Sequence, residues 1–225
     1  MAVTPQHIGI ILDGNRRWAR AKGLNTFEGH KKGYERVKEV AKYAHEKGVK
    51  YLTVYIFSTE NWKRSKKEVN YLMDFAYDIA SNEANALNER GARLVILGME
   101  KGLSPKLNKA FKDAQELTKN NTEGTLCVCF NYGGQQEIAD AATKAAKSKK
   151  KISIKDIDKN LYHPDVPPVD MVIRTSGEQR LSNFMLWRAS YSELYFVKKH
   201  LPDLTKTDFQ KALDEYAKRQ RRFGS

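Results

Sequence analysis

The chain has 225 residues, enough for one large domain, and a domain of this size buries roughly 70% of the surface of its unfolded chain, so its core needs no disulfide or structural metal. Its 40 lysines and arginines exceed its 27 acids and give a formal net charge of +13, which favours a polyanionic partner: nucleic acid, an anionic membrane surface or a phosphorylated substrate. No apolar stretch is long enough to span a bilayer and no secretion signal opens the chain, so we expect a soluble, cytosolic protein.

Six short apolar runs predict β-strands. Their residues do not alternate between apolar and polar, which is typical of parallel strands covered on both faces. The predicted strands are 7–12, 51–57, 93–97, 125–130, 170–174 and 194–197. In the fourth strand, Cys127 and Cys129 are expected to be small buried side chains rather than metal ligands, because no other ligand lies nearby at a metal-site spacing.

Segments of helical periodicity lie between these strands. In 31–47, apolar residues recur at three- and four-residue spacings, and Gly48 follows as a stop signal. The other predicted helices are 69–90, 104–118, 135–146 and 207–219. The alternation predicts an α/β fold: a single domain, 1–225, with a six-stranded, mainly parallel sheet flanked by helices. The lysine-rich stretch 147–159 and the stretch 163–168 are expected to be the least regular parts.

Polar segments follow four of the predicted strands. In open α/β sheets, ligands bind beyond the carboxyl ends of the strands, so we expect these segments to form one site. The segments are 13–18, 58–64, 131–134 and 174–183. They contain acids, amides, hydroxyls and arginines, and an arginine fork matches phosphate oxygens with bonds that contribute roughly 1.5–3 kcal/mol each.

The Asp13–Gly14 turn is the most informative of these segments. The Asp13 carboxylate is suited to hold Mg²⁺, and the start of the helix that follows presents N–H groups to an anion. Neither a P-loop nor a G-x-G-x-x-G turn follows the first strand, which argues against a nucleotide-binding loop. Taken singly, Asp-Gly is usually only a turn; taken with the other strand ends, it predicts diphosphate chemistry.

The chain closely resembles the cis-prenyltransferases, the family that includes undecaprenyl diphosphate synthase. The opening run HIGIILDGNRRWA, 7–19, matches the family's first signature. The other matching runs, in the family's order, are 29–33, 57–64, 131–134, 173–178, 180–184, 191–196 and 221–224. The resemblance covers nearly the whole chain.

The resemblance implies a role for each matching residue. It assigns Mg²⁺ binding to Asp13, without which turnover stops, and to Glu193, which joins Asp13 at the metal. The residues implied to hold the allylic diphosphate and the start of its chain are Gly14, Asn15, Arg16, Arg17, Trp18, His30, Trp62 and Arg64. Those implied at the reacting carbons are Ser58, Glu60 and Asn61, with Thr59 beside them as a substrate-binding residue. Those implied to bind isopentenyl diphosphate are Arg174, Arg180, Leu181 and Ser182.

The implied reaction adds isopentenyl diphosphate in Z geometry to an allylic diphosphate, expected to be farnesyl or geranylgeranyl diphosphate. Mg²⁺ and arginines then stabilise the departing diphosphate more than the intact ester. A proton must also leave the isopentenyl unit. Asn61 is often assigned as its acceptor in the family, but an amide is a weak base, so the released diphosphate and Asp13 stay open as alternatives. The expected product is a polyprenyl diphosphate of the undecaprenyl type.

A growing prenyl chain needs a dry, elongated pocket. The apolar stripe of 69–87 beside the strand 125–130 fits one wall of such a tunnel, and an ordinary helix-on-sheet core is the alternative reading. The resemblance favours the tunnel. It also implies a homodimer in which 222–224 reaches the partner's site, and it is compatible with peripheral contact with membrane lipid.

Three positions depart from the family pattern. Thr26 stands four residues before His30, where most members carry an arginine that helps to grip the allylic diphosphate. Gln135 stands where arginine is usual, and Gln179 where many bacterial members have histidine. These departures bear on substrate preference and rate rather than on the class of reaction.

Two competing functions follow from the same sequence. Some relatives are non-catalytic partner subunits that lack the metal-binding aspartate, but Asp13, Asn15 and Arg17 are all present here. The charge of +13 also suits a nucleic-acid-binding domain, yet the chain has no recognised module and its aromatics do not alternate with basic residues at a stacking spacing. A trans-prenyltransferase is excluded, because the paired D-D-x-x-D motif is absent and the α/β pattern conflicts with an all-helical fold.

Overall fold

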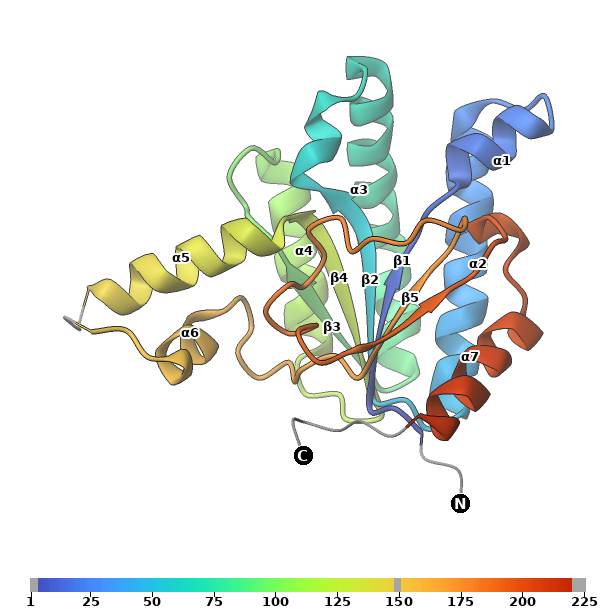
Figure 1. Cartoon of the computed structure of the whole chain (residues 1–225). Helices are drawn as coiled ribbons and strands as arrows, with labels where there is room; N and C mark the ends of the chain where they lie inside the picture. Colours follow the sequence, from blue (N-terminus) through green and yellow to red (C-terminus); the bar gives the residue numbers. More distant parts are fainter. Residues whose placement is uncertain (1–3, 148–150, 220–225) are drawn as a thin grey trace.

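The computed structural model describes residues 4–147 and 151–219, which form a six-stranded sheet (Figure 1). The strands are β1 (His7–Ile11), β2 (Tyr51–Ser58), β3 (Ala92–Leu97), β4 (Gly124–Tyr132), β5 (Met171–Arg174) and β6 (Glu193–Phe196). Their order is β3-β4-β2-β1-β5-β6, and each neighbouring pair is parallel. All six predicted strands and the parallel sheet are therefore confirmed.

The helices follow the strands in an α/β alternation. They are α1 (Asn15–Ala21), α2 (Thr26–Glu46), α3 (Lys66–Glu89), α4 (Pro105–Thr118), α5 (Gly134–Ala146), α6 (Ile154–Asn160) and α7 (Lys206–Lys218). Two 3₁₀ turns, η1 (Thr59–Lys63) and η2 (Leu201–Asp203), complete the set. Helix α6 corrects the expectation that 147–159 is irregular throughout. Its seven residues are too few to show a clear period, although Ser153 and Asp156 form a capping box at its start.

The two faces of the sheet are covered differently. Helices α2 and α7 pack on one side of β1, β2 and β5, while α3 and α4 pack on β2 and β4. The opposite face is covered mainly by the irregular chain that flanks β5, including Val166, Phe184 and Met185. Cys127 and Cys129 lie in this second core and are fully buried, as expected. Helices α5 and α6 project from the end of β4, at the left of Figure 1.

Three glycines let the first helix sit close to its neighbours. Gly14 is the N-cap of α1 with φ +106, a conformation that favours glycine. A Cβ at Gly29 of α2 would lie 2.2 Å from the carbonyl oxygen of Asn15, and one at Gly33 would lie 2.3 Å from its side-chain oxygen. Close contact with α2 therefore fixes α1 directly above the end of β1. None of the described helices is both long enough and apolar enough to cross a membrane.

Candidate active site

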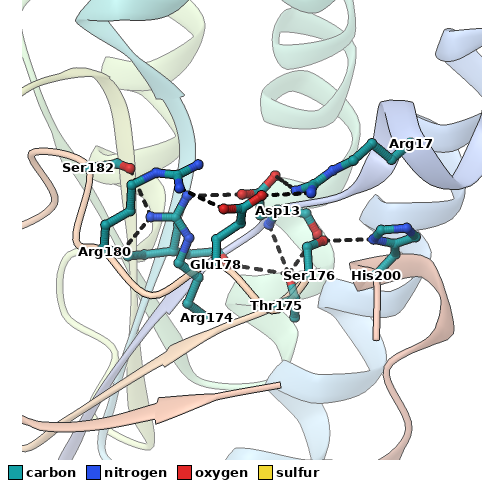
Figure 2. A network of polar contacts seen from close by, with 10 residues as sticks. Asp13, Arg17, Arg174, Thr175, Ser176, Glu178, Arg180, Ser182 and His200 are labelled. Atoms are coloured by element: carbon teal, nitrogen blue, oxygen red, sulfur yellow. Dashed lines mark hydrogen bonds and ion pairs between the residues drawn. The ribbon is translucent and has the colours of Figure 1, made fainter. Parts of the chain in front are cut away.

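Asp13 follows β1 and lies between two arginines (Figure 2). Arg174, the last residue of β5, donates through Nη2 to Asp13 Oδ2 at 2.9 Å, and Arg17 of α1 donates through Nη2 to Oδ1 at 3.1 Å. Burial alone would raise the pKa of Asp13, but the hydrogen bonds from Arg174 and Arg17 outweigh it and lower the pKa below its ordinary value. Asp13 is therefore a carboxylate at neutral pH.

A second carboxylate, Glu178, joins the same cluster. It accepts hydrogen bonds from Arg17 at 2.7 Å and from Arg180 at 2.6 Å, so it links α1 to the segment after β5. Hydrogen bonds from Arg180 and then Arg17 lower the pKa of Glu178. Glu178 lies within one of the matching runs, 173–178, but no role was predicted for it. Its position between Arg174 and Arg180 in the sequence could have indicated an ion pair.

Arg174 braces the segment that carries the predicted isopentenyl diphosphate residues. Its guanidinium donates through Nη1 to the carbonyl oxygen of Arg180 and, at 2.8 Å, to Ser182 Oγ. Arg174 is 3% exposed, whereas the Arg180 side chain is 59% exposed. The buried Arg174 thus holds Arg180 and Ser182 in place at the edge of the sheet. Leu181 between them packs partly buried against the second core.

A cavity of about 370 Å³ opens beside Asp13. The part of its lining that includes Asp13, called the mouth below, is polar and consists of Asp13, Gly14, Asn15, Arg16, Arg17, Arg20, His30 and Arg64. The rest of its lining is largely apolar and comes from α2, β2, α3 and β4; it includes Tyr34, Ile56, Phe57, Leu72, Phe75, Ile79 and Phe130. The predicted wall of α3 beside β4 is confirmed, and α2 supplies the wall that the sequence did not predict. Ile56 is 38% exposed although β2 is a central strand, because its side chain lines this cavity.

Glu68 organises the basic side chains at the cavity mouth. It is 6% exposed and accepts from Arg64 at 3.1 Å; His30 Nε2 lies 3.4 Å from it and Arg16 lies 3.8 Å from it. Burial and the nearby charge of Arg64 lower the pKa of His30, so this histidine is neutral at pH 7. Glu68 was not predicted, although a glutamate four residues after Arg64 at the start of a helix is a signal for such a pair.

Ser58 ends β2 and caps η1, and the predicted residues from Thr59 to Trp62 lie in η1; none of these residues lines the cavity. Asn61 Oδ1 accepts from the Ser58 N–H at 3.1 Å and so caps the turn. Glu60 accepts from Asn183 at 2.9 Å, and Trp62 donates to Asn131 at 2.8 Å. These bonds tie η1 to the ends of β4 and of the 180–183 segment. Thr59 also faces this junction, where a Cβ at Gly133 would lie 2.7 Å from its hydroxyl.

Two predicted residues lie elsewhere. Glu193 opens β6, level with Ile8 across the parallel sheet, whereas Asp13 follows the other end of β1. Glu193 instead accepts from Arg219 at 2.8 Å, so the prediction that it joins Asp13 at a metal is wrong for a single chain. Trp18 does not line the cavity; its indole N–H donates to Asp203 at 2.8 Å, which directs the ring toward η2.

The donor set fits a magnesium ion that a substrate carries rather than a metal held by the protein alone. Among the described residues, no three histidine, cysteine, aspartate or glutamate side chains form a metal-binding group. Mg²⁺ commonly takes one or two carboxylates together with substrate phosphates and water. Asp13, whose side chain is 27% exposed and charged, can supply one such carboxylate.

The three departures from the family pattern are on the surface of this region. Thr26 begins α2 one turn before His30, and the two residues therefore share a helix face. The N–H of Gln135 donates to Asn183 at 2.8 Å, so this position still supports the 180–183 segment through its backbone. Gln179 is exposed. The predicted C-terminal run 221–224 and part of the lysine-rich run, 148–150, lie outside the described residues.

Residues 11–224 match the family model described as putative undecaprenyl diphosphate synthase. The chain belongs to the cis-prenyltransferase family. It is 48% identical to an isoprenyl transferase of Thermotoga maritima over 225 residues, which cover 98% of this chain and 97% of that protein. It is 45% identical to a (2Z,6E)-farnesyl diphosphate-specific trans,polycis-polyprenyl diphosphate synthase of Thermobifida fusca, over 98% of this chain and 80% of that protein.

Solved structures agree with this membership. Lavandulyl diphosphate synthase from Lavandula x intermedia, in complex with dimethylallyl diphosphate, superposes with a TM-score of 0.95 at 33% identity and 99% coverage of both chains. A probable undecaprenyl diphosphate synthase from Campylobacter jejuni gives a TM-score of 0.85 at 27% identity, over 99% of this chain and 100% of that one. The chain is therefore a prenyl-transferring enzyme with the cis-prenyltransferase fold.

Proposed function

We propose that this prenyltransferase is Mg²⁺-dependent and adds isopentenyl diphosphate units to farnesyl or geranylgeranyl diphosphate to make a Z-polyprenyl diphosphate. The observation that carries the proposal is the cavity beside Asp13, which is lined by basic side chains at its mouth and by apolar side chains elsewhere. Such a site is complementary to an amphiphile with an anionic head and a hydrocarbon chain. Family membership supports the reaction class.

The allylic diphosphate is proposed to bind with its head at the cavity mouth. Arg16, Arg17, Arg64 and the neutral His30 offer donors there, and the N–H groups at the start of α1 have no side-chain cap. The prenyl chain would lie against the apolar lining from α2, β2 and α3. Its transfer from water to this lining gives roughly 0.8 kcal/mol for each buried CH₂, which favours a long hydrocarbon tail.

Isopentenyl diphosphate is proposed to bind at the segment after β5. Arg180 and Ser182 present a guanidinium and a hydroxyl at the sheet edge, and the buried Arg174 holds both in place. Arg17 lies between this segment and the cavity mouth, bonded to Asp13 and Glu178. We infer that its charge serves whichever diphosphate is leaving, because the expelled group carries more charge than the bound ester.

Asp13 is proposed to hold Mg²⁺ jointly with a diphosphate. When bound, the ion would neutralise charge on the leaving group. Arg174 and Arg17 keep the Asp13 carboxylate ionised and aimed between the two basic segments. Arg17, which also pairs with Glu178, can turn to the diphosphate when the ion takes its place at Asp13.

The proton acceptor is proposed to be the released diphosphate or Asp13 rather than Asn61. Asn61 uses its side-chain oxygen to cap η1 through Ser58 and does not line the cavity. An Asn61→Asp variant tests this, because a base at this position would gain strength and change the pH dependence of kcat. An unaltered pH profile supports a structural role for Asn61; a new ionisation in that profile assigns it the proton.

An undecaprenyl-type product, a homodimer and a cytoplasmic site with peripheral membrane contact complete the proposal. The family model and the Campylobacter jejuni structure support the first, since one is described as putative and the other as probable undecaprenyl diphosphate synthase. Analytical ultracentrifugation tests the dimer, and a monomer at micromolar concentration would reject it. Flotation of the purified chain with anionic and neutral vesicles tests the membrane contact; no vesicle-bound fraction would reject it.

The central experiment incubates the purified chain with farnesyl diphosphate, labelled isopentenyl diphosphate and either Mg²⁺ or a chelator. We expect labelled polyprenyl products with Mg²⁺ and none with the chelator. Chromatography against chain-length standards then identifies the product. Absence of product from farnesyl, geranylgeranyl, geranyl and dimethylallyl diphosphates would reject the proposed reaction, and a ladder that ends well short of undecaprenyl would reject the product.

A further inference from the structure

Thr175, directly after β5, holds the backbone of Asp13 (Figure 2). Its hydroxyl donates to the Asp13 carbonyl oxygen at 2.7 Å and accepts from the Asp13 N–H at 2.9 Å. The N–H of Leu201 donates to the same carbonyl at 3.1 Å. Three hydrogen bonds from the segments after β5 and β6 thus fix the peptide units on both sides of the Asp13 side chain. Thr175 is fully buried, so water does not compete for these bonds.

A serine–histidine pair supports the next residue of the turn. Ser176 Oγ lies 2.8 Å from His200 Nδ1. A Cβ at Gly14 would lie 2.1 Å from Ser176 Oγ and 2.6 Å from His200 Nδ1, so the Gly14 backbone rests directly on the pair. Gly14 has φ +106 and Ser176 has φ +76, a region that side-chain-bearing residues adopt only when the surrounding structure imposes it.

These three side chains do not themselves meet the substrate site. None of Thr175, Ser176 and His200 lines the cavity. The Ser176–His200 pair lies against the Gly14 backbone, where even a Cβ at Gly14 would clash with Ser176 Oγ, so the pair contacts the turn rather than the cavity. Their contacts all serve the turn that carries Asp13.

We propose that Thr175 and the Ser176–His200 pair are positioning residues that aim the Asp13 carboxylate at the metal-bearing diphosphate. The inference rests on the proposed role of Asp13. Arg174 and Arg17 bond the carboxylate itself, but both are also partners of other groups, so the direction of the Cα–Cβ bond depends on the backbone contacts. Misplacement of a reacting group by about 1 Å can reduce a rate by about 100-fold.

Thr175→Val tests the proposal, because it removes the hydroxyl and preserves the shape. We expect kcat to fall by about tenfold or more and the Mg²⁺ concentration for half-maximal rate to rise by about threefold or more, with the KM of the allylic substrate within about twofold of wild type. Thr175→Ser restores the hydroxyl and should return both values to within about threefold of wild type.

Thr118→Val is the matched control. The buried Thr118 hydroxyl also donates to a backbone carbonyl, that of Ala114 at 2.9 Å, and accepts a backbone N–H, that of Leu94 at 3.0 Å. This site lies at the end of α4, apart from the cavity. The control variant should lose thermal stability as Thr175→Val does, yet keep the wild-type Mg²⁺ requirement. A purely structural role for Thr175 predicts the same behaviour in both variants.

A binding measurement separates this inference from the proposed function. Calorimetry with inorganic pyrophosphate should show tighter binding to wild type when Mg²⁺ is present; Thr175→Val should lose that difference, and Thr118→Val should keep it. If Thr175→Val does not fold, Ser176→Gly decides, because glycine accepts the positive φ and removes Oγ. It should melt no lower than wild type but require more Mg²⁺. A wild-type Mg²⁺ requirement in the folded variant overturns the inference; wild-type protein without any Mg²⁺-dependent turnover or binding rejects the proposed function instead.

Discussion

Removal of the Asp13 carboxylate should stop catalysis and also cost measurable stability. In Asp13→Ala, Arg174 keeps its charge at 3% exposure and loses its acceptor at 2.9 Å. Removing one partner of a buried ion pair costs about 3–5 kcal/mol; we take the lower end, about 3 kcal/mol, because the Asp13 side chain is 27% exposed. For a domain of this size, that corresponds to a fall in Tm of roughly 6–12 °C. Asp13→Asn keeps an acceptor oxygen and should lose about half as much.

The catalytic loss should be larger in energy and equal in the two variants. Without a carboxylate for Mg²⁺, we expect the rate to fall about 1,000-fold or more, which is about 4 kcal/mol of transition-state stabilisation. Labelled isopentenyl diphosphate incorporation measures the rate, and circular dichroism measures the Tm. Asp165→Ala is the control: Asp165 pairs with Arg93 at 2.7 Å on the surface, so its loss should leave rate and Tm nearly unchanged. A rate within tenfold of wild type in Asp13→Asn would refute the reasoning.

Three further predictions concern specificity, product and acid stability. Thr26→Arg places a guanidinium one turn from His30 and should lower the KM of the allylic substrate by about tenfold, the effect of one charged hydrogen bond; an equal or higher KM contradicts it. Ile56→Ala enlarges the cavity and should lengthen the products on a chromatographic ladder, whereas the exposed Leu117→Ala should not; unchanged products in the first variant reject the role of the cavity. Burial lowers the pKa of His7 from 6.5 to about 4, so the unfolded chain binds a proton in this range that the folded chain does not. As the pH falls from 6.5 to about 4, the free energy of unfolding should therefore fall by about 1.4 kcal/mol per pH unit. In urea unfolding, the difference in that free energy between wild type and His7→Gln should shrink as the pH is lowered; a difference that does not change with pH contradicts this assignment.

The strands and long helices were predictable because burial imposes a period on each of them. Helix α3 carries apolar residues such as Leu72 and Ala76 on the face that packs on the sheet, and that spacing is visible in the sequence. Helix α6 has only seven residues, and its amphipathic pattern is too short to separate from a loop. Tertiary contacts stabilise the shortest helices, so the sequence pattern within such a helix is a weak signal of its presence.

Within a single chain Glu193 lies away from Asp13, and the place of its motif in the sheet explains why. The predicted strand 194–197 already put this residue before a parallel strand, and therefore at the edge opposite Asp13. A residue role transferred by motif has to agree with strand direction. Glu68 and Glu178 were missed although each has an arginine close to it in the sequence, because their contacts with more distant segments, through His30 and Arg17, follow only from the fold.

The sequence by itself determined the class of fold, the family and the four strand ends that supply polar groups, because these depend on residue order and on periods that short windows contain. Only the tertiary structure decided which charges pair and where the hydrocarbon cavity runs. Arg174 and Asp13 are far apart in the chain and meet at 2.9 Å only because β1 and β5 are neighbours. Ile56 lines a cavity together with residues of α2 and α3, such as Tyr34 and Phe75, that are distant from it in the sequence. Long-range contacts of this kind follow from packing in three dimensions, which no local pattern specifies.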